Sequence, residues 1–437
     1  MIGMRVLVVG QGGREHALVE ALHNADDHPE VFVTPGNPGM EEFAERVAIA
    51  PTDVESIVGW SRKNAIDFVV IGPESALAVG LADALREIGI AVLGPNAAGA
   101  RLETSKCYSK ELLKRLGLPT ADFHVAKTPE EAEARVRDAT YPLVLKADGL
   151  AAGKGVVIAE NEKEAFSVID AWMREGELGP AGQTLLIEEY LRGEEASILV
   201  LSDGERWMLF PPARDHKRIF DGDTGPNTGG MGACAPARVP SEAEAIAIAK
   251  RIVDPVLAAL REEKNPYRGI LYLGLMLTEK GPQVLEFNAR FGDPEAQVVL
   301  PLLAEDPLPL LWNAALGRLP AERHATFMKY EGAAVCVVFA SNGYPGRPVT
   351  GDYIEGLEGP WPHGIHVYHA GIDKHLERWV TSGGRVLGVT ARGMTLEGAR
   401  EAAYSAASHI YFPGMQYRRD IALVPEPTTE SSRGDES

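Results

Sequence analysis

The chain has 437 residues, of which 45% are hydrophobic and 24% charged, and its formal net charge is −19. This length is enough for about three domains, and the composition is ordinary for a soluble globular protein. The strong negative charge argues against a nucleic-acid or anionic-membrane surface, so any polyanionic ligand requires a local cationic pocket.

The three cysteines, Cys107, Cys234 and Cys336, are far apart in the sequence and form no C-x-x-C pair. They predict neither a disulfide framework nor a zinc site, and they fit a reducing, cytoplasmic location. The apolar run within residues 1–9 is too short for a signal peptide, and no stretch reaches the ~18 apolar residues of a membrane span. We therefore expect a cytoplasmic protein that does not contact membranes.

Residues 1–104 alternate between apolar strands and helices. Strands are expected at 5–9, 31–34, 68–71 and 91–93. Continuous apolar strands separated by helices indicate a parallel α/β sheet. Each strand is followed by glycine, or by proline and glycine, at the edge where open α/β sheets bind ligands.

The loop after the first strand contains Gly10, Gly12 and Gly13. The first two match a dinucleotide-binding fingerprint, but Glu15 stands at its third glycine and Thr34 replaces the acidic ribose ligand. We therefore predict that backbone N–H groups at this helix N-terminus bind one phosphate, and that the loop takes no part in ATP binding. A glycine turn that serves only packing is the alternative.

Residues 105–190 predict a small α+β lobe, centred on about 120–190. A helix is expected over 107–116, and Thr128 caps a second helix with Glu131 completing the capping box. A helix over 162–175 and a strand over 184–190 follow.

A β-hairpin over residues 144–157 is the most distinctive feature of this lobe. Its tip contains three glycines and Lys154, and Lys146 lies near its base. Glycines let backbone N–H groups approach an anion, and lysine adds a positive charge, so the tip suits a triphosphate. The Walker A spacing is absent, and an ordinary glycine-rich turn is the alternative.

Residues 191–325 predict a larger antiparallel unit with hairpins over 197–210 and 271–291. A capping box at Ser241 and Glu244 opens a long helix. Between them, residues 214–234 are predicted to form a long flexible loop that begins with a basic run. Loops of this length inside a compact domain are usually functional, although a solvated charge run remains the alternative.

Within the second hairpin, Glu286, Asn288 and Arg290 fall on one face, because strand side chains alternate. A carboxylate with an amide oxygen suits Mg²⁺, and Arg290 suits a carboxylate or a transferring phosphoryl group. A solvated strand face is the alternative. Near residues 187–195, the backbone after Glu189 could bind an adenine edge, and Glu194 or Glu195 could accept from ribose hydroxyls.

Residues 326–425 predict a third, α+β domain. Strands are expected at 334–339, 366–369 and 386–390, with a helix over 396–409. Residues 426–437 lack apolar side chains and should be disordered.

Taken together, these motifs resemble the ATP-grasp superfamily and, within it, the phosphoribosylamine–glycine ligase family. The similarity extends from residue 4 to about residue 424. The matching stretches are 10–17, 35–37, 71–74, 146–155, 215–218, 225–232 and 285–297.

This resemblance implies a multidomain α/β and α+β protein with an ATP-grasp fold over 105–325. A parallel α/β domain (1–104) would precede it, and an α+β domain (326–425) would follow. The implied reaction joins glycine to 5-phosphoribosylamine with ATP, through glycyl phosphate, and yields glycinamide ribonucleotide, ADP and phosphate in purine biosynthesis. The implied cofactor set is ATP with Mg²⁺ or Mn²⁺, with small molecules as the only partners and a monomeric state.

The resemblance also implies roles for individual residues. The implied ATP-binding residues are Lys106, Lys146, Gly153, Lys154, Gly155, Glu188, Glu189, Leu191 and Glu194. The implied substrate-binding residues are Gly10, Gly12, Gly13, Asn37, Pro73, Glu74, Asp215, Lys217, Arg290 and Asp293. The implied catalytic residues are Arg290, Lys154 and Asp215, and the implied metal ligands are Glu286 and Asn288.

The chain departs from the family pattern at Thr104, Arg214 and the Cys234–Ala235 pair. The strand before Glu286 carries Gly274 and no acid, where many ATP-grasp enzymes have a metal ligand. Glu286 would therefore serve two ions, or only one ion would be well held. Rival functions are ligation of a different carboxylate, as in biotin carboxylase-like or carboxyaminoimidazole-forming enzymes, and nucleotide sensing without catalysis. The intact metal face disfavours the sensor.

Overall fold

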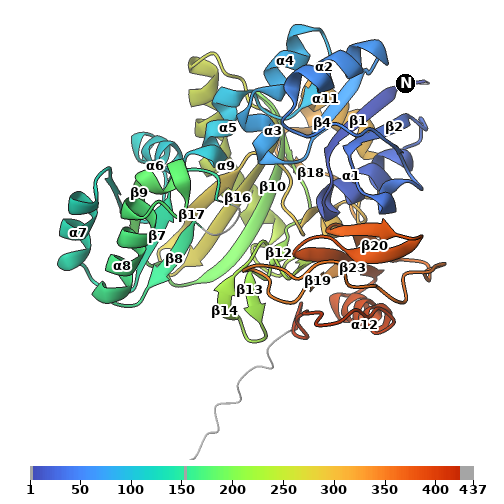
Figure 1. Ribbon diagram of the computed structural model, residues 1–437. Coiled ribbons are helices and arrows are strands. Elements are labelled where there is room, and N and C mark those ends of the chain that lie inside the picture. The colour runs from blue at the N-terminus through green and yellow to red at the C-terminus, as the bar shows by residue number, and fades with distance from the viewer. Residues whose placement is uncertain (1–2, 152–154, 424–437) are drawn as a thin grey trace, which may run out of the picture.

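The N-terminal sheet is parallel throughout, as the continuous apolar strands predicted. The computed structural model describes residues 3–151 and 155–423 (Figure 1). The five strands lie in the order β3-β2-β1-β4-β5. They are β1 (Arg5–Gly10), β2 (Glu30–Pro35), β3 (Glu45–Arg46), β4 (Phe68–Ile71) and β5 (Ala91–Leu93). The helices are α1 (Gly13–His23), α2 (Val54–Lys63), α3 (Glu74–Ala78), α4 (Leu81–Glu87) and α5 (Ala97–Thr104). The two-residue strand β3 was not predicted.

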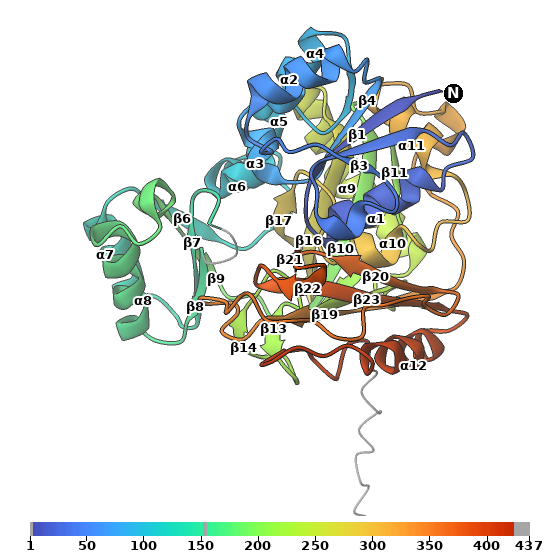
Figure 2. The ribbon, with the colours of Figure 1, turned by 45° about the vertical axis from the view of Figure 1, so that its right-hand side comes forward.

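A small lobe projects from the side of the molecule (Figure 2). Its antiparallel sheet has the order β6-β9-β7-β8. The strands are β6 (Phe123–Ala126), β7 (Leu143–Ala147), β8 (Val156–Ala159) and β9 (Leu185–Glu189), and the helices α6 (Lys106–Arg115), α7 (Pro129–Arg137) and α8 (Glu162–Ile169). Thr128 caps α7 as predicted, but Glu131 accepts from Lys127 N–H instead of closing a capping box on Thr128. The pairing of β7 with β8 confirms the predicted hairpin.

The central sheet is the larger unit, with the order β17-β16-β10-β11-β18, and it is antiparallel except for the parallel pair of β11 with β18. Its strands are β10 (Glu194–Asp203), β11 (Trp207–Leu209), β16 (Arg268–Thr278), β17 (Gly281–Asn288) and β18 (Thr326–Phe327). The accompanying helices are α9 (Glu242–Glu262), α10 (Ala296–Val299) and α11 (Pro307–Ala315). The predicted capping box is present in full at the start of α9, where Ser241 and Glu244 exchange hydrogen bonds.

The prediction of a flexible loop over residues 214–234 was wrong. This segment forms four short strands: β12 (Arg214–Asp215), β13 (Arg218–Phe220), β14 (Thr224–Asn227) and β15 (Gly232–Ala235). The Arg418 side chain, only 1% exposed, holds the β13–β14 hairpin from the far end of the chain through Asp223 and the Arg218 carbonyl. Strands this short carry almost no local pattern, so their order depends on distant partners.

The C-terminal sheet combines two parts of the chain, in the order β12-β15-β19-β23-β20. The later strands are β19 (Ala333–Ala340), β20 (Ile365–His369) and β23 (Arg385–Gly393), covered by α12 (Leu396–Ala407), as predicted. An additional hairpin, β21 (Ile372–His375) with β22 (Arg378–Thr381), was not predicted. In this sheet β15 pairs with β19, and β19 pairs with β23. Residues 232–235 are therefore part of the C-terminal sheet, although they lie about a hundred residues before β19 in the sequence.

Buried side chains join the N-terminal, central and C-terminal units, whereas the lobe has a buried cluster of its own. One cluster packs Leu7 and Val9 of the N-terminal sheet against Trp207 and Leu273 of the central sheet and Leu257 of α9. All three cysteines are free and buried. Within residues 3–151 and 155–423, no helix is both long and apolar enough to cross a membrane.

Candidate active site

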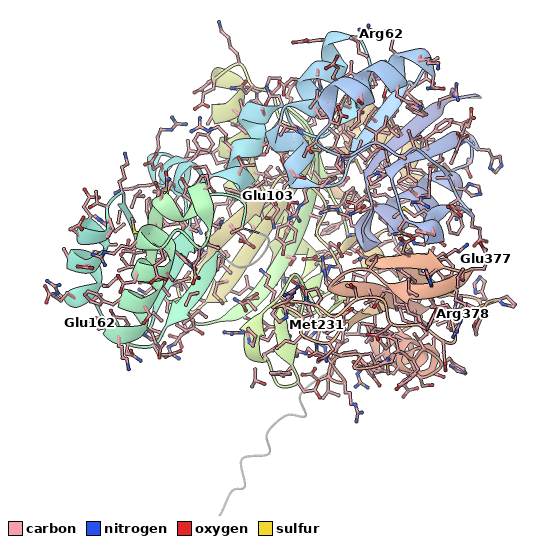
Figure 3. All side chains as sticks on the ribbon, viewed as in Figure 1. Arg62, Glu103, Glu162, Met231, Glu377 and Arg378 are labelled. Carbon is pink, nitrogen blue, oxygen red and sulfur yellow. The ribbon has the colours of Figure 1, made fainter. Side chains whose placement is uncertain are left out.

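A cavity of about 540 Å³ is lined by residues of the N-terminal helices, the small lobe, the central sheet and the C-terminal sheet. Figure 3 labels one of its residues, Glu103, near the centre of the molecule, where the N-terminal helices meet the central sheet. The charged and polar residues on its wall include Arg14, Glu103, Lys106, Lys110, Lys146, Glu188, Glu195, Asp215, Lys217, Glu286, Asn288, Arg290, Asp293, Glu295 and Arg385. The volume is within the range of small-molecule and cofactor sites.

Glu188 forms the centre of a buried charge cluster at the lobe end of this cavity. Its side chain is 2% exposed, and its two carboxylate oxygens lie 2.9 Å from Lys146 Nζ and 3.2 Å from Lys110 Nζ. Lys146 also donates to the Leu285 carbonyl at 3.2 Å, which ties the lobe to β17. Burial lowers the pKa of Lys110 to about 8, although Glu188 opposes this shift. The carboxylate of Glu188 is thus engaged by lysines, while the residue lines the cavity as expected.

The base of the lobe hairpin is fixed to the start of α6. Lys106 donates to the carbonyl oxygens of Ala147 and Gly149, both at 3.1 Å. The Asp148 carboxylate accepts from Cys107 N–H at 3.1 Å and from the Ser105 hydroxyl at 3.3 Å. Carboxylates are stabilised at helix N-termini, so this pair of contacts sets where the hairpin leaves the lobe.

At the tip of this hairpin, Gly155 is buried and lines the cavity. The predicted ligands Gly153 and Lys154 lie outside the described residues. Leu191 and the exposed Glu189 also line this end.

The polar face predicted for β17 points into the cavity, where Glu286, Asn288 and Arg290 all line its wall. Arg290 lies two residues beyond the end of the strand at Asn288. Lys217 Nζ lies 3.3 Å from Glu286 Oε1. Lys217, together with Lys146 and Lys106, outweighs the effect of burial and lowers the pKa of Glu286 to about 2. The carboxylate is therefore ionised at any physiological pH.

The donor set at this face fits a cation that binds chiefly to phosphate and water. Glu286 and Asn288 provide one carboxylate and one amide oxygen. The residue opposite Glu286 on the neighbouring strand β16 is Gly274, which adds no acid. Among the described residues, no group of three or more His, Cys, Asp or Glu side chains is placed to hold a metal. Mg²⁺ commonly takes only one or two protein carboxylates beside substrate phosphates, so the two oxygens suit it.

Arg290 is held by two acids of the N-terminal helices. Its Nη2 lies 2.6 Å from Glu103 Oε1, and its Nε lies 3.2 Å from Glu74 Oε2. Burial would lower the pKa of Arg290, but these acids raise it above its ordinary value. The predicted residues Glu74 and Arg290 are thus brought together, whereas Glu103 was missed because nothing local to it signals a contact 187 residues away.

A second clamp joins the C-terminal sheet to the cavity. Arg385 Nη2 lies 3.1 Å from Asp293 Oδ2, and Arg385 Nη1 donates to the Gly229 carbonyl at 2.6 Å. Burial tends to raise the pKa of Asp293, but Arg385 and Arg14 outweigh it and lower the pKa. Arg385 was not predicted, because it belongs to a strand more than ninety residues from its partners.

Asp215 is a further acid on the cavity wall. Burial and the neighbouring Glu295 raise its pKa well above the ordinary value, and its Oδ1 has no hydrogen-bond partner among residues 3–151 and 155–423. The next residue, His216, is buried, and its Nε2 accepts from Ala422 N–H at 3.3 Å. Burial lowers the pKa of His216 to about 4, so it is neutral near pH 7 and serves as an anchor for the C-terminal segment.

Several predicted residues lie outside the cavity wall. Glu194 pairs with Arg214 at 3.1 Å, and Glu195 lines the cavity in its place. The Asn37 amide donates to the carbonyls of Gln11 and His369, joining the N-terminal domain to β20. Pro73 precedes α3 as its N-cap residue.

The first glycine loop was predicted to bind one phosphate. Gly10, Gly12 and Gly13 are not among the residues that line the cavity. The Gly12 N–H donates to Glu15 Oε2 at 2.7 Å, so a carboxylate of the chain itself takes this hydrogen bond. The phosphate site itself stays a prediction.

Three family models match the chain in succession. They describe the N domain (residues 4–103), the ATP-grasp (A) domain (residues 104–296) and the C domain (residues 334–424) of phosphoribosylglycinamide synthetase. Together they extend over most of the chain.

Curated relatives and solved structures agree with these matches. The chain is 45% identical over 420 residues to the phosphoribosylamine–glycine ligase of Caulobacter vibrioides, covering 96% of this chain and 97% of that protein. The crystal structure of the Thermotoga maritima phosphoribosylamine–glycine ligase is 35% identical with a TM-score of 0.82, covering 96% of this chain and 100% of that chain. The biotin carboxylase domain of Hydrogenobacter thermophilus 2-oxoglutarate carboxylase is 20% identical with a TM-score of 0.74, covering 95% and 92%, and shares the fold.

Proposed function

We propose the activity of this chain from its family. The chain belongs to the phosphoribosylglycinamide synthetase family, whose N, A and C domain models it matches. It is a carbon–nitrogen ligase that joins glycine to 5-phosphoribosylamine with ATP, giving glycinamide ribonucleotide, ADP and phosphate in purine biosynthesis. One observation supports the proposal beyond family membership. Glu286 and Asn288 line the same cavity as three lysines, Lys106, Lys146 and Lys217.

The chemistry of the reaction explains this arrangement. A carboxylate is a poor electrophile, so glycine is first phosphorylated by ATP, and the ribosylamine nitrogen then attacks the glycyl phosphate. Lys106, Lys146 and Lys217 would bind and orient the phosphates, because positioned cations stabilise a transferring phosphoryl group. Glu286 and Asn288 would hold Mg²⁺ or Mn²⁺, which would neutralise phosphate charge when bound. The lobe hairpin, with Gly153, Lys154 and Gly155, would exclude water from the acyl phosphate.

The adenine end of ATP is proposed to lie against the lobe, near Glu189 and Leu191, with Glu188 holding Lys146 in place. Glu195 is better placed than Glu194 to meet the ribose, since it lines the cavity.

The glycine and ribosylamine are proposed to occupy the other end of the cavity. The carboxylate of glycine is proposed to bind beside Arg290, which Glu74 and Glu103 hold on the cavity wall. The unpaired Oδ1 of Asp215 would accept a hydrogen bond from an amino group of either substrate, since a buried oxygen without a partner is costly. These roles agree with the assignments made from the family resemblance.

We further propose domain limits near residues 104 and 325, a monomeric state and a cytoplasmic location. The deciding experiment measures ADP release with ATP, Mg²⁺, glycine and phosphoribosylamine, omitting each in turn. ADP release that requires both glycine and phosphoribosylamine supports the proposal. ADP release that proceeds equally well with bicarbonate in place of glycine would instead support the carboxylase-like rival.

A further inference from the structure

The glycine loop that follows β1 already contains an anion, the carboxylate of Glu15. This side chain is 2% exposed. Its Oε2 accepts from Gly12 N–H at 2.7 Å, and its Oε1 accepts from Arg14 Nε at 2.6 Å. Both carboxylate oxygens are therefore used inside the protein.

The backbone around Glu15 is shaped to admit this carboxylate. A Cβ atom added to Gly10 or Gly72 would overlap the Glu15 carboxyl group. Gly10 also has φ of +129°, a conformation that side chains rarely adopt. Gly10, in the loop that the sequence suggested for a phosphate, and Gly72 after β4 thus make room for a side chain of the same molecule.

Glu15 also determines where Arg14 points. While Nε is bound to Glu15, Arg14 Nη1 donates to the Phe291 carbonyl at 3.1 Å, which links the N-terminal loop to the segment carrying Arg290 and Asp293. Arg14 lines the cavity, and its Nη2 has no hydrogen-bond partner within the part of the chain that the structure describes. One edge of this guanidinium, on the cavity wall, is therefore left without a partner in the described protein.

From this geometry we propose that Glu15 is a positioning residue: its carboxylate occupies the anion position of the glycine loop and holds Arg14 with its free edge toward the substrate phosphate. The phosphate of phosphoribosylamine then binds to Arg14 and not to the Gly12 N–H. This inference rests on the proposed function, which supplies the identity of the phosphate-bearing substrate.

A role in helix capping alone is the competing explanation, since Glu15 stands at the third position of α1 and accepts from the N-cap N–H. Glutamine serves this capping role as well as glutamate does. Glu15→Gln therefore retains the cap but removes the charge that pairs with Arg14, and so separates the two explanations. The matched control is Glu20→Gln, on the same helix, where the glutamate pairs with His366 at 2.9 Å, away from the cavity.

The kinetic test compares wild type, Glu15→Gln and Glu20→Gln. We expect Glu15→Gln to raise KM for phosphoribosylamine at least about tenfold, because a charged contact loses its support, with KM for ATP within twofold. Arg14→Lys should give the same pattern, and Glu20→Gln should change neither constant. An unchanged KM for phosphoribosylamine in Glu15→Gln, or an equal rise in both KM values, would overturn the proposal.

A second measurement is independent of activity. In protein labelled with ¹⁵N-glycine, the Gly12 amide resonance, identified by its loss in Gly12→Ala, is followed as inorganic phosphate is added. We expect no shift in wild type and a saturable shift in Glu15→Ala, where the N–H is released. A wild-type Gly12 resonance that shifts with phosphate would show that the loop binds anions despite Glu15. If wild type lacks glycine-dependent ADP release, the proposed function fails, while this measurement still decides the occupancy of the loop.

Discussion

The ammonium group of Lys217 lies 3.3 Å from Oε1 of Glu286, although the two residues are 69 positions apart in the chain. Lys217 follows β12 of the C-terminal sheet, and Glu286 belongs to β17 of the central sheet. Burial would lower the pKa of Lys217, but Glu286 and other acids raise it well above its ordinary value. A charged pair between β17 and the segment after β12 therefore lines the cavity in which phosphoryl transfer is proposed.

Glu286→Gln should abolish turnover, by at least about a hundredfold, while the protein stays folded. The reason is that Glu286 is the single acid on the polar face of β17, and an amide neither neutralises Lys217 nor holds a cation well. The steady-state rate is measured at millimolar Mg²⁺, with circular dichroism to check the fold. Glu194→Gln, outside the cavity, is the control. Near wild-type activity in Glu286→Gln would exclude the metal assignment.

Asp148→Asn should raise KM for ATP by about three- to tenfold and change the melting temperature little. The asparagine keeps the shape of the side chain but loses the charge that favours contact with the N-terminus of α6, so the hairpin base is held less firmly. Asp170→Asn, which removes a surface partner of Arg174 in the same lobe, is the control. An unaltered KM for ATP would mean that the α6 contact does not position the hairpin.

Glu188→Gln should lower the free energy of unfolding by about 3 kcal/mol, because it leaves two buried lysines without a counter-charge. Denaturant unfolding at pH 7 measures this loss, and Glu189→Gln, at an exposed position, should cost little. Burial already lowers the pKa of Lys110 to about 8, against 10.5 when exposed. In the folded protein Lys110 therefore loses its charge as pH rises past about 8, and the cost of leaving that charge without a partner falls. A loss that does not diminish by pH 9 would contradict the ionic explanation.

Acid should destabilise the protein through His216. Its folded pKa of about 4 lies below the unfolded value of 6.5, so the unfolded state binds more protons between these values. Stability is then lost as pH falls from 6.5 toward 4, with about 2 kcal/mol lost between pH 7.5 and pH 5. His216→Gln keeps an acceptor for Ala422 N–H and cannot titrate, so its unfolding free energy should change less over this interval. Equal pH dependence in both proteins would exclude His216 as the source.

The features that the sequence predicted correctly are those that depend on neighbouring residues in the chain. The alternation of side chains along β17 placed Glu286 and Asn288 on the cavity wall, because successive side chains of a strand point to opposite faces. Arg290, just beyond the end of the strand, also lines the cavity as predicted. The parallel N-terminal strands and the lobe hairpin were predicted for the same reason: their apolar runs are long and are bounded by glycine.

What could not be predicted depends on contacts between distant parts of the chain. Lys110, Glu103 and Arg385 acquire their roles from partners far away in the sequence, and no spacing in the sequence indicates those partners. Glu15 is different, because it stands where the third glycine of the fingerprint would be. A buried acid in that position was a signal that the loop had an internal ligand.

The pairing of β15 with β19 has a consequence for dividing this protein into pieces. Residues 232–235 lie near the middle of the chain, yet their neighbour in the sheet is residues 334–337. A fragment that stops before residue 330 would leave β15 with unpaired N–H and C=O groups along an apolar strand, a template for association with other chains. We expect such a fragment to aggregate, and co-expression with residues 326–425 to keep it in solution by restoring the missing strand.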